Sequence, residues 1–214
     1  MIKTILHTDK MKKTLLAILV AAVLWFIMFS PWTAPHVNFW YTMTASGVIL
    51  TSLSLMWGKK QEKFSPSLAW QVMWGIVIAV VLWGVFWTGD KLSQMLFDFA
   101  RPQVNSIYEM KGGMSGTVIA LLLLFIIGPA EEIFWRGFVQ RRLSGKYGRI
   151  IGFIIATACY TLVHIWSFNF MLIVAAAACG CCWGLLYCIR PKMLPALIVS
   201  HALWDAAAFV VFPF

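Results

Sequence analysis

The sequence predicts an all-α membrane protein, a polytopic bundle of about seven transmembrane helices with the N-terminus inside and the C-terminus outside. Hydrophobic residues make up 61% of the 214 residues. Charged residues make up only 12%, whereas soluble domains usually carry about 25%. Long apolar runs alternate with short segments that contain charges, glycine or proline, and each run approaches the roughly 20 residues that a spanning helix needs.

The apolar runs define the predicted spans in chain order. They cover residues 14–30, 38–57, 68–88, 117–140, 149–168, 171–189 and 193–212. The first run follows lysines 10, 12 and 13, as in a signal peptide, but bulky side chains continue it and no small-residue cleavage site follows. We therefore expect a retained span. Residues 89–116 mix apolar and charged side chains, which fits either an interfacial amphipathic helix or an ordinary loop.

The basic residues predict the orientation, because cytoplasmic loops carry an excess of Lys and Arg. With the N-terminus inside, the inside segments hold 13 of them and the outside segments hold 3. The inside group is Lys3, Lys10, Lys12, Lys13, Lys59, Lys60, Lys63, Arg141, Arg142, Lys146, Arg149, Arg190 and Lys192. The outside group is Lys91, Arg101 and Lys111.

The placement of the charges argues against a nucleic-acid-binding protein, and the cysteine pattern argues against a disulfide or zinc-ribbon framework. The net charge of +9 does not predict a nucleic-acid partner, because the basic residues gather at the ends of apolar runs. The five cysteines are odd in number, lie within apolar runs and lack zinc-ribbon spacing, so we expect packing residues and no disulfide framework. Gly180 and Gly184, four residues apart in the sixth span, predict close helix packing.

Ionisable side chains inside the predicted spans are the main functional signal. A charge at the bilayer centre costs at least about 2.5–3.5 kcal/mol, so such groups must face one another or a wet cavity. Glu132 and Arg136 are four residues apart and can pair on one helix face, whereas Glu131 points elsewhere. An ion pair that only locks helices together would leave Glu131 unexplained. The preceding Gly128-Pro129 predicts a local kink.

Two further spans carry histidine. His164 closes the segment Tyr160-Thr-Leu-Val-His164, and His201 lies four residues before Asp205, so that both share a helix face. Either set alone could be a hydrogen-bonded lock between helices. Together with the glutamates and the arginine, they supply the groups of a hydrolytic site.

The order Glu-Glu-x-x-x-Arg, aromatic-x-x-x-His and His-x-x-x-Asp within residues 117–212 resembles the CPBP family of intramembrane proteases. This family includes CAAX prenyl endopeptidases of the Ras-converting type and the bacteriocin-processing Abi proteins. The resemblance implies an intramembrane endopeptidase, with residues 1–116 as N-terminal spans plus an interfacial segment and residues 117–214 as the catalytic core. It makes Glu131 the general base, helped by His164, and makes His201 and Asp205 the oxyanion stabilisers. Glu132, Arg136 and Tyr160 would support the site or bind substrate.

Two positions depart from the family pattern. Tyr160 replaces a common Phe, and Asp205 replaces a common Asn. An ionised Asp205 would repel an oxyanion, so it is protonated, orients His201 or binds a metal. Glu131, His164, His201 and Asp205 would form a zinc set of two nitrogen and two oxygen ligands. The family has been described both as metalloproteases and as glutamate proteases, and we favour a glutamate-activated water.

The expected partners are a peptide or protein substrate at the membrane and the lipid bilayer, with no nucleic acid. We expect a multi-pass protein of the bacterial inner membrane whose site opens to the cytoplasm. The alternative is a non-enzymatic scaffold or bacteriocin-immunity protein that binds a partner through a buried polar network. A proton-coupled transporter is a third hypothesis, but a second set of polar helices for its path is lacking.

Overall fold

The computed structural model describes residues 2–58 and 67–214, with side chains from residue 9 onward in the first range. Every regular element in these ranges is helical, which confirms the predicted all-α bundle. Within them, six helices are long and apolar enough to cross a membrane, in reasonable agreement with about seven predicted spans.

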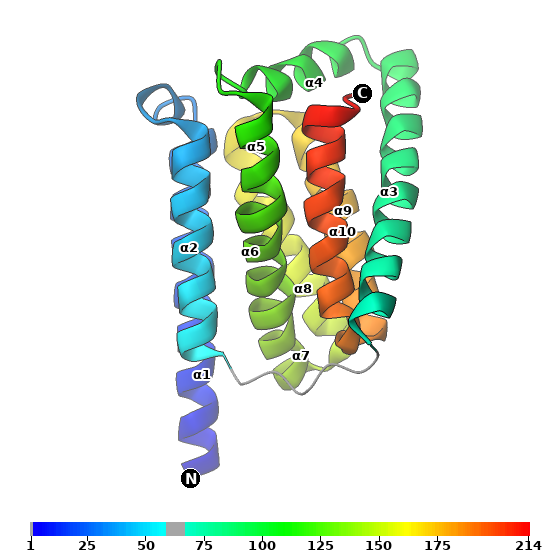
Figure 1. The fold of residues 1–214 in the computed structure, drawn as a ribbon. Helices are drawn as coiled ribbons and strands as arrows, with labels where there is room; N and C mark the ends of the chain where they lie inside the picture. Colours follow the sequence, from blue (N-terminus) through cyan, green and yellow to red (C-terminus); the bar gives the residue numbers. More distant parts are fainter. Residues whose placement is uncertain (1, 59–66) are drawn as a thin grey trace.

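The elements follow one another as a series of antiparallel passes (Figure 1). In chain order they are α1 (Ile2–Phe29), η1 (Ala34–His36), α2 (Phe39–Trp57), α3 (Leu68–Leu96), α4 (Ala100–Glu109), α5 (Gly116–Leu122), η2 (Leu123–Ile127), α6 (Gly128–Glu132), η3 (Ile133–Gln140), α7 (Arg141–Tyr147), α8 (Arg149–Leu162), η4 (Val163–Ser167), α9 (Phe170–Ile189), η5 (Pro191–Met193), α10 (Leu194–Ala206) and η6 (Ala207–Val211). The stretch from α5 to α7 is one helical rod, so the fourth span extends to Tyr147 and not to the predicted residue 140.

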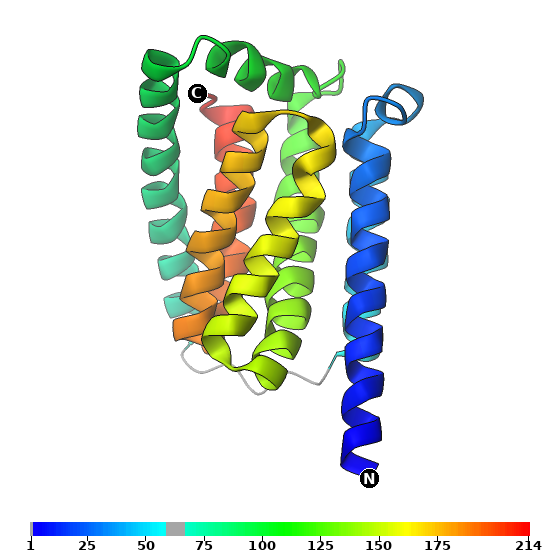
Figure 2. The ribbon, with the colours of Figure 1, turned by 180° about the vertical axis from the view of Figure 1, so that it is seen from behind.

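The bundle is arranged around this rod and α10. Helices α1 and α2 form a pair on one side, and α3 packs against α10 on the other (Figure 1). Helices α8 and α9 cover the back (Figure 2). Helix α4 lies across one end of the bundle, close to the C-terminus and opposite the N-terminus.

Helix α2 is the predicted span that is less apolar than the other six. Serine and threonine lower its hydropathy, but several of their hydroxyls donate to carbonyls one turn earlier in the same helix. Ser46, Ser52 and Ser54 bond to the carbonyls of Thr42, Val48 and Leu50 at 2.7–2.8 Å. These three hydroxyls are paired inside α2, as a bilayer requires of polar groups, whereas the buried hydroxyl of Thr44 has no hydrogen-bond partner among the described residues.

The helix boundaries between the third and fourth spans also differ from the predicted ones. Helix α3 continues to Leu96, beyond the predicted end at residue 88. Helix α4 follows and buries Ala100 and Val104 on its apolar face. The structure therefore favours an amphipathic helix over an ordinary loop, although the helix begins later than the sequence pattern indicated.

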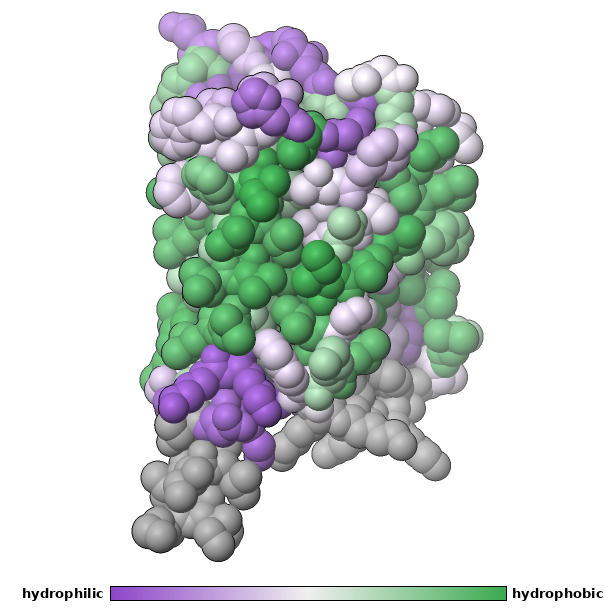
Figure 3. Space-filling view, turned by 90° about the vertical axis from the view of Figure 1, so that its left-hand side faces the viewer, coloured by the Kyte–Doolittle hydropathy of each residue, from purple (hydrophilic) through white to green (hydrophobic). Residues whose placement is uncertain are grey.

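An apolar belt crosses the middle of the face that Figure 3 draws, with polar residues toward both ends. Exposed Leu19, Val23 and Ile49 contribute to it from α1 and α2. Such a belt matches the hydrocarbon core of a bilayer. The basic residues of α7 lie at the end opposite α4. Lys59, Lys60, Lys63 and the side chain of Lys3, which the orientation argument also used, lie outside the described residues.

We expect opposite ends of the bundle to face opposite sides of the membrane. Alkaline phosphatase fused after Gly112, beyond α4, should be active, because that enzyme matures outside the cytoplasm. Green fluorescent protein fused after Gly145, in α7, should fluoresce from the cytoplasm. The reverse pattern in whole bacterial cells would contradict the orientation.

Candidate active site

The close approach of α6 to α10 creates the site. A Cβ atom at Gly128 would lie 2.7 Å from the Cα of Ala202, a distance that only glycine allows. The predicted kink at Gly128 is replaced by a continuous helix whose turns widen to π-helix in η2 and η3. Such π-helical turns often mark functional sites. Here they set Glu131 and Glu132 of α6 opposite His201 of α10.

Glu132 is the centre of a buried polar network. Its Oε1 accepts a hydrogen bond from Arg136 Nη1 at 2.8 Å and lies 2.9 Å from Nδ1 of His201. Glu132 is fully buried, and Arg136 and His201 are nearly so. The predicted pair of Glu132 with Arg136 is therefore present, and the structure adds His201 as a second partner.

Arg136 is enclosed by aromatic rings as well as by its carboxylate. Its guanidinium lies 4.8 Å from the ring centre of Tyr160 and 5.6 Å from that of Trp183, and Nη2 donates to the carbonyl of Cys179 at 3.4 Å. Trp183 also stacks on His201, with ring centres 3.9 Å apart and planes 19° apart. These contacts fix the planes of the Arg136 guanidinium and the His201 imidazole.

The predicted close packing at Gly180 and Gly184 positions Tyr160. A Cβ at Gly180 would lie 3.1 Å from the Tyr160 ring, and one at Gly184 would lie 3.0 Å from Phe153. Larger residues would therefore push α8 away from α9 and move Tyr160 off Arg136.

Asp205 lies beside His201 and holds its second nitrogen. His201 Nε2 is 3.4 Å from Asp205 Oδ2, one helical turn along α10. The imidazole is thus held between two carboxylates, Glu132 and Asp205. Of the three roles left open for Asp205, this geometry matches orientation of His201.

Glu131 differs from its neighbour Glu132 in facing a cavity. It is buried, and its Oε2 has no hydrogen-bond partner among the described residues. The Tyr160 side chain lies close enough to interact with it. A carboxylate oxygen that is buried and unpaired is a natural binding position for water.

His164 is held by a residue from outside the predicted catalytic core. Its Nδ1 lies 2.8 Å from the carbonyl oxygen of Tyr160, and its Nε2 accepts a hydrogen bond from the indole of Trp25 at 3.1 Å. Nδ1 must carry the proton to bond to a carbonyl, so Nε2 supplies its one lone pair to Trp25. In this arrangement the neutral ring has no free acceptor.

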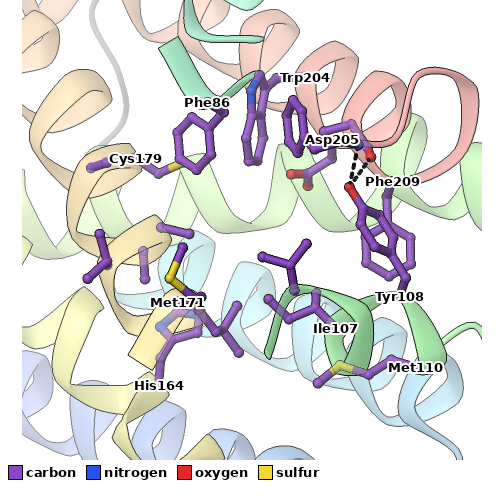
Figure 4. A pocket seen from close by; sticks show the side chains of 18 of the residues that line it. Phe86, Ile107, Tyr108, Met110, His164, Met171, Cys179, Trp204, Asp205 and Phe209 are labelled. Carbon is purple, nitrogen blue, oxygen red and sulfur yellow. Dashed lines mark hydrogen bonds between the residues drawn. The ribbon is translucent and has the colours of Figure 1, made fainter. Parts of the chain in front are cut away.

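One cavity of about 420 Å³ joins these residues. Glu131, Tyr160, His164, His201 and Asp205 all line it, together with many apolar side chains from seven helices. In Figure 4, Asp205 and His164 approach the cavity from different elements. Tyr108 and Met110 of the α4 region close one end of it. The predicted shared cavity is therefore present.

The cavity lies in the half of the bundle nearer α4 and not in the half nearer α7. With the predicted N-inside orientation this would be the outer half, so the orientation and the expected opening to the cytoplasm do not agree with each other, and both stay predictions. The fourth span runs to Tyr147, so Glu131 lies near the middle of a 32-residue helix. His164, at the far end of its own span, then falls beside it.

The proposed zinc ligands are not arranged to hold the metal. The single lone pair of His164 is engaged by the Trp25 indole, and both nitrogens of His201 lie beside carboxylates. Among the described residues, three or more His, Cys, Asp or Glu side chains do not gather in a metal-binding group. The set of Glu131, His164, His201 and Asp205 therefore does not fit zinc in this arrangement.

Two site residues carry no recognisable sequence signal. Trp25 and Trp183 are 2 of 12 tryptophans and lie in apolar stretches of their helices. The sequence placed all candidate site residues within residues 117–212, yet α1 supplies the donor to His164. Only the spatial contact distinguishes these two indoles from the other tryptophans.

Residues 113–207 match the family model described as type II CAAX prenyl endopeptidase Rce1-like. The match contains all seven residues singled out from the sequence and confirms the resemblance to the CAAX protease family over this segment. No curated protein matches the chain. No solved structure matches it either.

Glu132→Gln should destabilise the protein strongly. The amide removes the charge that Arg136 and His201 share, and breaking a buried pair typically costs about 3–5 kcal/mol. Thermal unfolding in detergent should show a large fall in Tm. Glu109→Gln on exposed α4 is the control and should leave Tm unchanged. An unaltered Tm for Glu132→Gln would contradict the role of Glu132 as the centre of the network.

Proposed function

Because residues 113–207 form a segment of the CAAX protease family, we propose that this protein is an intramembrane endopeptidase in which Glu131 activates water. The observation that supports the proposal most directly is the free Oε2 of Glu131 in a cavity that also contains His201 and Asp205. The substrate is a membrane-associated peptide or protein. A predominantly apolar cavity with a few polar groups suits such a ligand.

In the proposed reaction, a water molecule binds at the free oxygen of Glu131. Glu131 removes its proton as the water oxygen attacks the peptide carbonyl carbon, which gives a tetrahedral intermediate. Glu131 then passes the proton to the leaving amide nitrogen, and the carbon–nitrogen bond breaks. The products are a carboxylic acid and an amine, and the carboxylate of Glu131 is regenerated.

His201 is the proposed partner of the oxyanion. Glu132 holds Nδ1 and Trp183 holds the plane of the ring, so Nε2 has a fixed position beside Asp205. When Nε2 carries a proton, it can donate to the developing negative charge. A donor whose position is fixed in advance stabilises the transition state without reorganisation. Asp205 orients the ring in this scheme.

His164 takes part in water activation only when Trp25 releases it. Its single acceptor lone pair is engaged by the Trp25 indole, so its Nε2 cannot take a proton in the arrangement observed. In the resting site, water activation is therefore assigned to Glu131 without help from His164.

The scaffold or immunity hypothesis accounts for less of the structure. The network of Arg136, Glu132 and His201 could lock helices together without any chemistry. It gives no reason for the additional buried carboxylate of Glu131, which has an unpaired oxygen in the cavity. That unpaired oxygen favours the enzyme.

Glu131→Gln should abolish proteolysis while the protein stays folded. The amide is nearly isosteric but cannot accept and return a proton, and loss of a general base typically costs on the order of 10²–10⁴ in rate. Purified variants should be compared for cleavage of a quenched peptide library in detergent. Tm should match the wild type. Wild-type cleavage by Glu131→Gln would sink the catalytic assignment and favour the scaffold hypothesis.

Chelation should leave activity intact. The lone pair of His164 is engaged by the Trp25 indole, so the expected zinc set lacks one of its ligands and neither EDTA nor 1,10-phenanthroline should lower kcat. Cleavage should be measured after prolonged dialysis against each chelator, with zinc added back to a parallel sample. Loss of activity that zinc restores would show that the ligands rearrange to bind metal.

A further inference from the structure

The acidic side chains that line the cavity are Asp90, Glu131 and Asp205, and among the described lining residues none is Lys or Arg. Glu131 and Asp205 belong to the site already described. Asp90, on α3, does not, and nothing in the proposed reaction uses it.

Asp90 is buried with an unsatisfied oxygen. The residue is 6% exposed. Its Oδ2 is engaged, because Gln94 Nε2 donates to it at 2.5 Å and Lys91 Nζ lies 3.4 Å away. Its Oδ1 is inaccessible to solvent and has no hydrogen-bond partner. An unpaired buried carboxylate oxygen is costly, so its persistence calls for a ligand that is absent from the free protein.

The neighbours of Asp90 do not supply that ligand. Lys91 is half-exposed and also lies 6.0 Å from the Trp87 ring centre, so it is a surface contact to the other oxygen. Tyr108 lies near Asp90, but its hydroxyl already donates to the Ala208 carbonyl and accepts from the Phe214 amide (Figure 4). Burial raises the pKa of Tyr108, and the negative charge of Asp90 adds to this shift.

The position of Asp90 relative to the reacting groups follows from helix geometry. Phe86 packs on Trp204, with ring centres 4.6 Å apart, and Asp205 follows Trp204. Asp90 lies one turn beyond Phe86 on the same face of α3, toward α4. One to two helical turns correspond to roughly 5–11 Å. An extended peptide rises about 3.3 Å per residue, so two or three residues cover this distance.

We propose that Asp90 is a specificity residue that binds a basic side chain of the substrate, two or three residues from the bond that is cleaved. Its Oδ1, which is covered in the free protein, becomes the acceptor for a lysine ammonium or an arginine guanidinium when the substrate enters, while the apolar wall contacts the rest of the peptide. This inference rests on the proposed endopeptidase function. It narrows the substrate class to apolar peptides that carry an isolated basic residue.

The test compares matched peptides on purified full-length protein in detergent. Quenched peptides with an apolar sequence should carry a single Lys or the neutral norleucine, placed in turn at each position within three residues of the cleaved bond. At one such position the wild type should prefer Lys by about 10- to 100-fold in kcat/KM, as expected for a buried charge contact. Equal rates for Lys and norleucine at every position would overturn the proposal.

Variants then assign the preference to one residue. Asp90→Asn keeps the shape and the contacts of Oδ2 but removes the charge, so the Lys preference should disappear while the norleucine peptide is cleaved normally. Asp90→Glu should keep part of the preference. Asp98→Asn removes an exposed carboxylate from the same end of the bundle and should change nothing. A Lys preference that survives in Asp90→Asn would assign it elsewhere.

A binding experiment separates this inference from the proposed function. If the wild type cleaves no peptide, the endopeptidase proposal fails, but fluorescence anisotropy can still compare the two peptides. The Glu131→Gln protein should bind the Lys peptide more tightly than the norleucine peptide, and adding Asp90→Asn should remove the difference. Equal binding of both peptides would refute the role of Asp90 independently of catalysis.

Discussion

The carboxylate of Glu132 is the constraint on which the interior of this bundle depends. A charge buried so completely is tolerated only when hydrogen bonds replace its hydration. Arg136 from the same rod and His201 from α10 supply those bonds to one oxygen. The positions of both helices are therefore tied to a single atom, and the ring of His201 has little freedom to turn.

The backbone packing makes this contact geometrically feasible. Because Gly128 has no Cβ, α6 can pack closely against the backbone of α10. Gly180 allows the same close approach of α9 to α8 beside Tyr160. Trp183 then fills the space between the helices, where it covers both Arg136 and His201. The glycines bring the helices close together and Trp183 fills the remaining space. Together they keep water away from the network of Glu132, Arg136 and His201.

The sequence was informative wherever a local pattern has a direct structural meaning. Hydropathy predicted the helices, and four-residue spacing predicted the pair of Glu132 with Arg136 and the proximity of His201 to Asp205. The boundaries at residues 88 and 140 failed, because an apolar run ends before the helix that contains it. The sequence indicated that the ionisable groups of distant spans share a site, but it carried no signal for the individual partners. The bonds from His201 to Glu132 and from Trp25 to His164 join residues 69 and 139 positions apart.

The hydrogen bond between Trp25 and His164 links the N-terminal helices to the site. The segment that matches the protease family starts at residue 113, so the donor to one of its histidines comes from a part of the chain outside the match. Helix α1 packs against η4, the short turn that carries His164. Exchange of the N-terminal helices would therefore change the proton-accepting capacity of that imidazole while every residue of the matched segment stayed the same. The lone pair of His164 thus depends on α1, and its availability can change without any substitution in the matched segment.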